Sequence, residues 1–228
     1  MTIVSFSGID GAGKSTQIME FESWLRYAGL RTTLVTFWDD VVVLSRVREF
    51  LSYKIFKGDQ GVGSPERPVN RRDKNVTSWL ITCLRCCFYL LDALHLRWRV
   101  RGMRKSKTSK SGADVVIFDR YIYDELANLP LTRRMARVFV WVLLKLIPTP
   151  DVGYVIDADP AAARARKPEY PVEFLLRNRE AYATLTRLAG DIAVIEPGPI
   201  EIVQGKIRQE MLRALWTGRK SALALSHS

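Results

Sequence analysis

Cysteine is scarce in this sequence of 228 residues, and the three that occur, Cys83, Cys86 and Cys87, are crowded into one short stretch. An odd number of cysteines on one expected helix excludes a disulfide framework and favours a reducing compartment. These cysteines with His95 would also form a poor zinc site, because C-x-x-C-C on one helix does not direct four ligands to one point.

Long hydrophobic runs are also missing. The longest strongly apolar stretch, Val138 to Ile147, is about half a membrane span and carries Lys145, so it is typical of a buried helix. The first ten residues, MTIVSFSGID, contain neither a basic leader nor a small-residue cleavage site. We therefore expect a cytoplasmic protein without a transmembrane segment.

Acidic residues are outnumbered, with 24 Asp and Glu against 35 Lys and Arg, which gives a formal net charge of +11. Such a field attracts nucleotides, nucleic acid or anionic lipid without choosing among them. The stretch 97–110 holds seven of the basic residues and no acid. It is either a solvated helix end and loop or a docking surface for polyanions such as nucleic acid.

The apolar pattern alternates between short strands and longer helices. Strands are expected at 3–7, 32–37, 113–118, 152–156 and 191–195, and helices at 15–27, 41–56, 76–103, 132–147, from 160, 172–189 and 199–215. This alternation predicts an α/β fold with a doubly wound, five-stranded parallel sheet flanked by helices in three layers. We expect one domain at 1–216, a mobile loop at 57–75 and a disordered tail at 217–228, with ligands at the carboxyl ends of the strands.

The motif G-x-x-x-x-G-K-[ST] occupies Gly8 to Ser15, between the first expected strand and the first expected helix. In such a loop, backbone N–H groups point at phosphate oxygens, the lysine reaches the β- and γ-phosphates, and the Ser hydroxyl ligates Mg²⁺. The sequence therefore predicts a P-loop NTPase fold that uses ATP and Mg²⁺. The residues expected to bind the cofactor are Gly8, Asp10, Gly11, Ala12, Gly13, Lys14, Ser15 and Thr16.

The segments FSGIDGAGKSTQ and FDRY, with an arginine-bearing segment after DADP, make the chain resemble the thymidylate kinase family of P-loop nucleoside monophosphate kinases. The resemblance spans Ile3 to about Leu188. It implies that Asp119 helps to hold the magnesium shell and that Arg120 grips the phosphate of the acceptor nucleotide. It also places Asp10 near the sugar hydroxyl of the acceptor.

The family places a transition-state cation either in the P-loop or on a lid that closes over ATP. The position in the loop is Gly11 here, so the resemblance implies that the cation comes from a short lid at about 160–172. Arg164 and Arg166 are the candidates, and a basic, solvated helix face is the alternative interpretation. Arg177 and Arg179 are further candidates along the chain.

The acceptor side departs from the family pattern. Phe37-Trp38-Asp39-Asp40 stands where the family has a short turn, and Asp39 is a candidate for orienting the acceptor or for a strand-end acid. The run Tyr121 to Glu125 also resembles the corresponding segment of deoxyribonucleoside kinases. The candidate contacts for the acceptor base lie on the expected helix 76–103, and they are Trp79, Arg85, Phe88, Tyr89 and Asp92.

Three functions follow from these observations. We expect transfer of the γ-phosphoryl group of ATP to a nucleotide acceptor, in the first place a pyrimidine deoxynucleoside monophosphate. One alternative is a kinase of a nucleoside or other small-molecule hydroxyl, with Asp39 as the base. The other is an NTP-dependent nucleic-acid-binding or regulatory protein that uses residues 97–110. The family resemblance also implies a homodimer through the long helices as a candidate assembly.

Overall fold

The computed structural model describes residues 1–48, 79–106 and 112–225. In this part of the chain, five parallel strands form one sheet in the order β2-β3-β1-β4-β5. The predicted α/β class and parallel, five-stranded sheet are therefore confirmed. The strands are β1 (Thr2–Ser7), β2 (Thr32–Thr36), β3 (Val115–Asp119), β4 (Val152–Ile156) and β5 (Ile192–Ile195).

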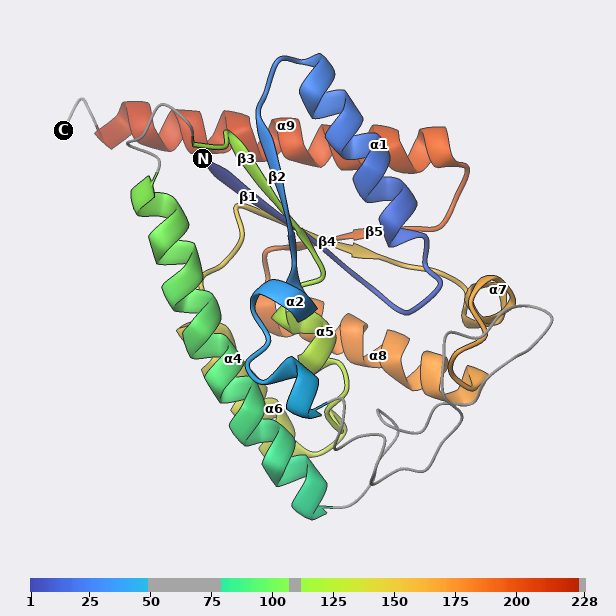
Figure 1. Cartoon of the computed structure of the whole chain (residues 1–228). Helices are drawn as coiled ribbons and strands as arrows, with labels where there is room; N and C mark the ends of the chain where they lie inside the picture. The colour runs from blue at the N-terminus through green and yellow to red at the C-terminus, as the bar shows by residue number, and fades with distance from the viewer. Residues whose placement is uncertain (49–78, 107–111, 226–228) are drawn as a thin grey trace.

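Helices cover both faces of the sheet (Figure 1). One face carries α1 (Lys14–Tyr27) and α9 (Ile200–Leu225), which contact each other. The other face carries α4 (Trp79–Ser106), α5 (Ile122–Leu126), α6 (Arg134–Leu146) and α8 (Val172–Ala189). Two short helices, α2 (Phe37–Asp40) and α7 (Pro160–Arg166), follow β2 and β4 at the carboxyl edge.

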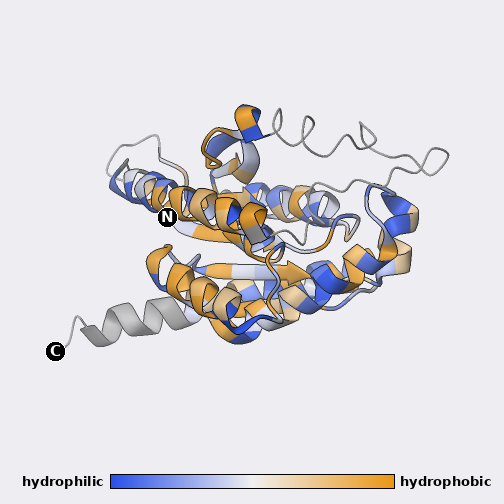
Figure 2. Cartoon of the chain, turned by 90° about the horizontal axis from the view of Figure 1, so that it is seen from below, coloured by the Kyte–Doolittle hydropathy of each residue, from blue (hydrophilic) through white to orange (hydrophobic). Residues whose placement is uncertain are grey.

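The central strands are apolar because both of their faces are covered. Figure 2 shows largely hydrophobic strands enclosed between the helix layers. Phe6 of β1 lies 5.0 Å from the ring of Tyr154 and 5.5 Å from that of Phe21 on α1. The buried Tyr154 hydroxyl donates a 2.7 Å hydrogen bond to the carbonyl of Ile207, which ties β4 to α9. Buried, continuous apolar strands of this kind are typical of parallel sheets.

The helix prediction needs three corrections. The expected helix 41–56 is replaced by α2, a turn and a helical stretch at 45–48, while 49–56 lies outside the described residues. The run after Arg120 forms the short helix α5, which the sequence pattern did not predict. Finally, α9 continues to Leu225, well into the predicted tail 217–228. Its last residues keep a helical backbone because their composition favours helix.

Other boundaries agree with the sequence pattern to within a few residues. The N-cap prediction for α7 is confirmed, since the Asp159 carboxylate accepts a 2.9 Å hydrogen bond from the backbone N–H of Ala162 and Pro160 follows. The predicted mobile loop 57–75 lies outside the described residues. Within the described ranges, none of the helices has the length and hydropathy that a membrane span requires.

Candidate active site

The glycine loop follows the central strand β1 and is fixed by two close backbone approaches. Gly8, Gly11 and Gly13 all have positive φ angles, of 141°, 84° and 87°. A Cβ atom on Gly8 would lie closer than 3.0 Å to the carbonyl oxygen of Ile156, and one on Gly11 would lie equally close to that of Ala163. Only glycine fits these two positions, so the loop is packed directly against β4 and α7.

The loop leaves the positive end of α1 open to an anion. The N-cap of α1 is Gly13, which has no side chain to accept hydrogen bonds, and the first turn contains no acidic residue. A Cβ on Gly13 would meet no atom within 4 Å. Ser15 and Thr16 in this turn are exposed. A helix N-terminus with these properties offers backbone N–H groups and a favourable dipole to phosphate, so these residues fit the phosphates of ATP.

Lys14 is folded back over the glycine loop. Its Nζ atom donates hydrogen bonds to the carbonyl oxygens of Gly8 at 2.7 Å and Ile9 at 2.9 Å, and the side chain is buried. A buried ammonium needs such acceptors to offset its desolvation. The same hydrogen bonds hold the lysine directly above the loop that the motif assigns to phosphate.

The carboxyl end of β3 brings Arg120 beside the glycine loop. Its guanidinium donates hydrogen bonds to Asp10 at 2.5 Å and to Asp124 at 3.0 Å. Burial opposes the charge of Arg120, but the two carboxylates outweigh this effect and hold the pKa of Arg120 above its ordinary value. Asp10, Arg120 and Asp124 therefore form one charged cluster with an excess of one negative charge.

The backbone of Arg120 is unusual. Its φ of 70° places a non-glycine residue in the left-handed region, and its N–H donates to the carbonyl of Phe6 at 3.0 Å. Such a conformation costs about 1–3 kcal/mol and is typical of functional sites. Asp119, the preceding residue, is partly buried and stands in register with Phe6 of β1 and Thr36 of β2. The end of β3 thus places Asp119 and Arg120 next to the loop, as the sequence predicts.

Helix α8 contributes a residue that the sequence analysis missed. The buried Tyr182 hydroxyl donates a 3.2 Å hydrogen bond to the carbonyl of Gly8. Burial, and secondarily the nearby Asp124 carboxylate, raise the pKa of Tyr182 well above its ordinary value, so the hydroxyl stays protonated. A tyrosine on an amphipathic helix 174 positions away carries no local signal of this contact.

The predicted lid begins beside the glycine loop, because α7 packs on Gly11 through Ala163. Arg164 is partly buried and donates to the carbonyl of Tyr170, whereas Arg166 is exposed. Arg179 lies further along and is held by Asp157 through two hydrogen bonds of 2.7 and 2.6 Å. The structure therefore places α7, which carries Arg164 and Arg166, against the glycine loop through Ala163, and it commits Arg179 to an ion pair.

The segment after β2, which is expected to face the acceptor, is held by three polar residues of α4, of which Asp92 is buried and His95 and Arg99 are partly buried. Asp92 accepts a 2.7 Å hydrogen bond from the backbone N–H of Val43, and His95 Nδ1 lies 2.6 Å from the carbonyl oxygen of Val41. Arg99 forms a 3.3 Å ion pair with Asp40. These contacts fix the segment after β2. Asp39, in α2, is exposed at the carboxyl edge.

A second buried charged cluster lies next to Asp124. Arg48 contacts Asp92 at 2.7 Å and Glu125 at 3.1 Å, and its guanidinium lies 4.3 Å from the centre of the Phe88 ring. Burial, then the Asp92 charge, raise the pKa of Glu125 well above its ordinary value, against the opposing effect of Arg48. Asp92, a candidate contact for the acceptor base, is paired with Arg48, which reaches it from the segment after β2.

Other candidates from the sequence lie elsewhere. Within the basic stretch, Arg97 donates to the carbonyl of Leu146, Arg99 pairs with Asp40, and Arg104 lies 3.9 Å from Asp151. The remainder of this stretch at 107–110 and the side chain of Trp79 lie outside what the structure describes. The three cysteines are free thiols.

A magnesium ion would need the phosphates of ATP as ligands. Within the described ranges, no group of three or more His, Cys, Asp or Glu side chains is placed to hold a metal ion. Hydroxyl and carboxylate oxygens are nevertheless ligands that Mg²⁺ prefers, and it is usually held by one or two protein groups plus substrate phosphates. Ser15 and Asp119 fit that requirement.

Comparisons with known proteins agree with this geometry. No protein-family model matches the chain. The chain is 23% identical to a probable thymidylate kinase from Methanosphaera stadtmanae over 217 residues, which cover 93% of this chain and 98% of that protein. It is 25% identical to a thymidylate kinase from Bifidobacterium longum over 225 residues, with 96% and 95% covered.

A solved structure extends the comparison to the fold. The crystal structure of thymidylate kinase from Ehrlichia chaffeensis superposes with a TM-score of 0.56 at 19% identity, and the match covers 92% of this chain and 98% of that one. The two chains therefore share their fold over nearly the whole length.

Proposed function

We propose that this chain, which is thymidylate kinase-like in sequence and fold, transfers the γ-phosphoryl group of ATP to a nucleotide acceptor, and that the acceptor is dTMP. The observation that carries the proposal is the meeting of the glycine loop with Arg120 at the carboxyl edge. A donor triphosphate and an acceptor phosphate need cationic partners on two sides of one reaction centre. Similarity to thymidylate kinases over more than nine-tenths of the chain supports the choice of acceptor.

In this proposal each residue binds or orients a reactant. The backbone N–H groups of the glycine loop and Lys14 hold the β- and γ-phosphates, and Ser15 and Asp119 hold the magnesium shell. When bound, Mg²⁺ would neutralise charge on the phosphate oxygens. Arg120 binds the acceptor phosphate with the N–H groups that its hydrogen bonds to Asp10 and Asp124 leave available, and Arg164 and Arg166 face the transferred group from the lid. Asp10 orients the sugar of the acceptor and lines up Arg120, which it contacts at 2.5 Å.

The reaction needs no base from the protein. An oxygen of the acceptor monophosphate forms a bond to the γ-phosphorus of ATP, and the bond from that phosphorus to the β–γ bridging oxygen breaks. The products are ADP and a nucleoside diphosphate. The work of the protein is to align two polyanions, to screen their repulsion and to exclude water.

Acceptor preference tests the proposal. ADP release is measured with ATP and Mg²⁺ in the presence of dTMP, thymidine or no acceptor. We expect release that depends on dTMP, with little release for thymidine. Release with thymidine but not with dTMP would instead assign the chain to the hydroxyl kinases that the run after Arg120 also resembles.

Lys14→Ala tests the glycine loop. Loss of a cation that contacts the transferred group costs about 10²–10³ in rate or more, so we expect dTMP-dependent ADP release to fall by at least that factor. Circular dichroism and thermal unfolding check that the variant is folded. A folded Lys14→Ala protein with the wild-type rate would refute the role of this loop.

Asp39→Asn distinguishes phosphoryl transfer to a monophosphate from phosphoryl transfer to a hydroxyl group. With a monophosphate acceptor no proton has to be removed, so we expect kcat to stay within about threefold and any effect to fall on the KM for the acceptor. With a hydroxyl acceptor the carboxylate is the general base, and its loss costs about 10²–10⁴ in kcat. Steady-state kinetics with both acceptors therefore distinguish orientation from base catalysis.

A further inference from the structure

A cleft of about 620 Å³ lies between α8 and the segment 127–133 that leads into α6. Its lining includes no residue of the glycine loop, and neither Arg120 nor Asp124. The buried side chains of Leu129, Leu131, Phe174 and Ala181 form apolar surface in it. The volume falls within the range of about 300–1,000 Å³ that is typical of small-molecule sites.

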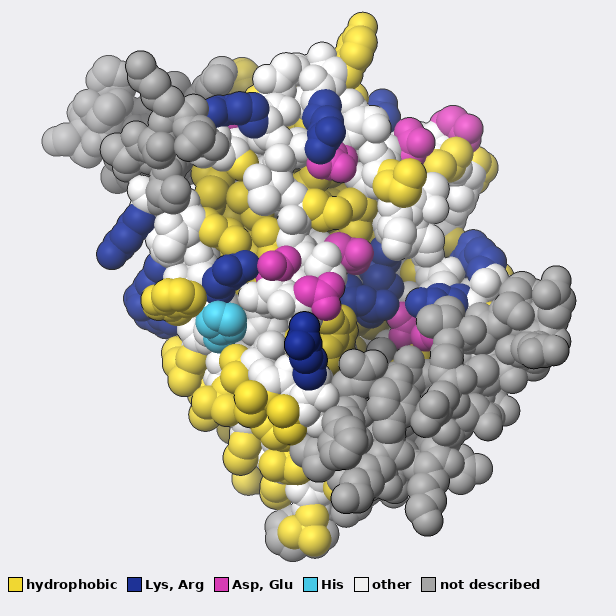
Figure 3. All heavy atoms as spheres, viewed as in Figure 1, with side chains coloured by type: hydrophobic (Ala, Val, Ile, Leu, Met, Phe, Trp, Pro, Cys, Tyr) yellow, Lys and Arg dark blue, Asp and Glu magenta, His cyan; other side chains and the backbone are white. Residues whose placement is uncertain are grey.

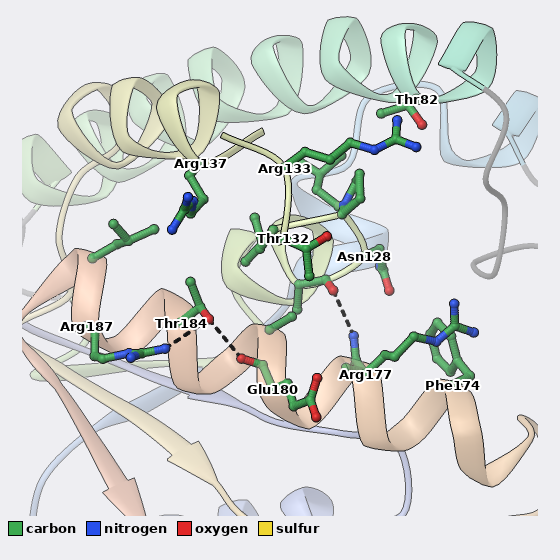
Figure 4. Close-up of a pocket in the computed structure, with 17 residues that line it drawn as sticks. Thr82, Asn128, Thr132, Arg133, Arg137, Phe174, Arg177, Glu180, Thr184 and Arg187 are labelled. Atoms are coloured by element: carbon green, nitrogen blue, oxygen red, sulfur yellow. Dashed lines mark hydrogen bonds between the residues drawn. The ribbon is translucent and has the colours of Figure 1, made fainter. Parts of the chain in front are cut away.

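The rim of this cleft is strongly basic. Figure 4 shows Arg133 and Arg137 on the side of α6 and Arg177 and Arg187 on α8. Glu180 is the one acid among the described lining residues, which include four arginines. Arg187 donates to the carbonyl of Ala183 and to the Thr184 hydroxyl, at 3.1 and 3.3 Å, which holds its guanidinium beside the cleft.

The beginning of α6 is electrostatically unfavourable without a ligand. Its N-cap is Arg133, whose guanidinium cannot accept a hydrogen bond, and Arg134 and Arg137 follow with no acid in the first turn. Cations are disfavoured at the positive end of a helix. In the described part of the chain, no carboxylate pairs with Arg133 or Arg137. A bound anion would balance the positive charge that these exposed arginines add to the helix end.

We infer that this cleft binds a phosphorylated small molecule that carries an apolar or aromatic part, at a site separate from the glycine loop. The phosphate binds on the arginine rim at the start of α6, which Arg133 and Arg137 form, and the apolar part covers the surface formed by Leu129, Leu131 and Phe174. Glu180 accepts a hydrogen bond from a hydroxyl or N–H group of the ligand. This site goes beyond the proposed function and does not depend on it.

Hydrogen exchange with phenyl phosphate as the probe tests the site. At ten times the dissociation constant, a ligand that binds the closed state slows exchange about tenfold. We expect this slowing at residues 134–138 in the wild type and in Arg134→Gln, the matched control whose arginine does not line the cleft. We expect its loss in the double variant Arg133→Gln/Arg137→Gln. Three results would each overturn the site. They are unchanged exchange at 134–138 in the wild type, slowing that persists in the double variant, and a loss of slowing in Arg134→Gln equal to that in the double variant.

Inorganic phosphate tests the apolar surface in the same assay. Covering about 60 Å² of apolar area corresponds to roughly a tenfold gain in affinity, so phenyl phosphate should bind about ten times more tightly than phosphate. Equal affinity would overturn the apolar part of the inference. Amide hydrogen exchange at residues 8–16 reports ligand binding at the glycine loop separately from binding in the cleft. Failure of dTMP-dependent transfer would therefore refute the proposed function and leave the result for the cleft intact.

Discussion

Gly11 and Gly13 have nearly the same backbone conformation but different surroundings. Both have φ near +85°, yet a Cβ on Gly11 would strike the carbonyl of Ala163 whereas one on Gly13 would meet open space. The motif pattern marks both glycines equally. Only the structure distinguishes Gly11, on which α7 packs, from Gly13, which faces open space, because the contact of Gly11 with Ala163 joins residues that are 152 positions apart.

Alanine substitutions measure this difference. Gly13→Ala incurs only the left-handed strain of a non-glycine residue, about 1–2 kcal/mol. Gly11→Ala adds a backbone clash, so its free energy of unfolding should fall by at least a further 1–2 kcal/mol. Urea denaturation of both variants checks the order. Equal stability of the two proteins, or a less stable Gly13→Ala, would contradict the packing of α7 on the loop.

The sequence predicts the position of Arg120 but not its backbone conformation or its partners. The FDRY segment indicated a phosphate-binding arginine at the end of a strand, and the structure puts it there. Its left-handed backbone and its two carboxylate partners were not predicted, since Asp10 lies 110 residues away in the chain. The family resemblance supplied both residues without indicating that they contact each other.

At the scale of elements, a charged clamp joins the starts of β2 and β3. The Arg31 guanidinium and backbone N–H donate hydrogen bonds of 3.0–3.2 Å to the Asp114 carboxylate. The side-chain hydrogen bond, followed by the backbone one, lowers the pKa of Asp114 to about 2. Ordinary strand propensity does not reveal this clamp, which aligns the two strands just before their first paired residues, Thr32 and Val115.

This clamp predicts a pH dependence with a definite sign. A carboxylate with a depressed pKa stabilises the fold above its unfolded pKa, about 3.9 for Asp. The stabilisation should be complete above about pH 5 and lost as the pH falls from about 4 through about 2. We expect Asp114→Asn to be less stable than the wild type at pH 6 and equally stable below pH 2. An NMR titration of Asp114 with a midpoint near 4 would contradict the clamp.

The elements differ in how far the sequence predicts them. The strands, α1, α8 and the capped start of α7 follow from hydrophobic period and from Asp159-Pro160, which are local signals. The segment after β2 was assigned to one helix because its valines and leucines suit either structure. Its actual path depends on the contacts of Asp92, His95 and Arg99 with the backbone and with Asp40. Those contacts are tertiary, so periodicity alone could not predict them.

At the scale of the whole molecule, α4 presents an exposed apolar stripe. Leu80, Leu84, Leu91, Leu94 and Trp98 are 40–70% exposed and, with the exposed Cys87, follow a spacing of four and three residues. Figure 3 shows hydrophobic side chains gathered along the lower left of the molecule, where α4 lies. A heptad stripe on a long helix is typical of a helix–helix interface. This observation supports the homodimer that the family resemblance implies.

Sedimentation equilibrium tests the dimer. We expect a dimer at micromolar concentration, and we expect Leu91→Glu/Leu94→Glu to weaken it at least 100-fold, because each subunit would bury two charges in place of apolar surface. Met19→Glu is the control, since Met19 is an exposed apolar residue on α1. A monomeric wild type, or a dimer that the Met19 substitution disrupts equally, would contradict the assignment to α4.

The central claim is that the glycine loop and Arg120 bring a triphosphate and an acceptor phosphate to one reaction centre. Phosphorus NMR of the full-length protein with ATP, Mg²⁺ and dTMP tests it most directly, because the signals of the products are distinct. We predict that the signals of ADP and dTDP grow together and in equal amounts. ADP accompanied by inorganic phosphate without dTDP, or unchanged spectra from the folded protein, would contradict the account.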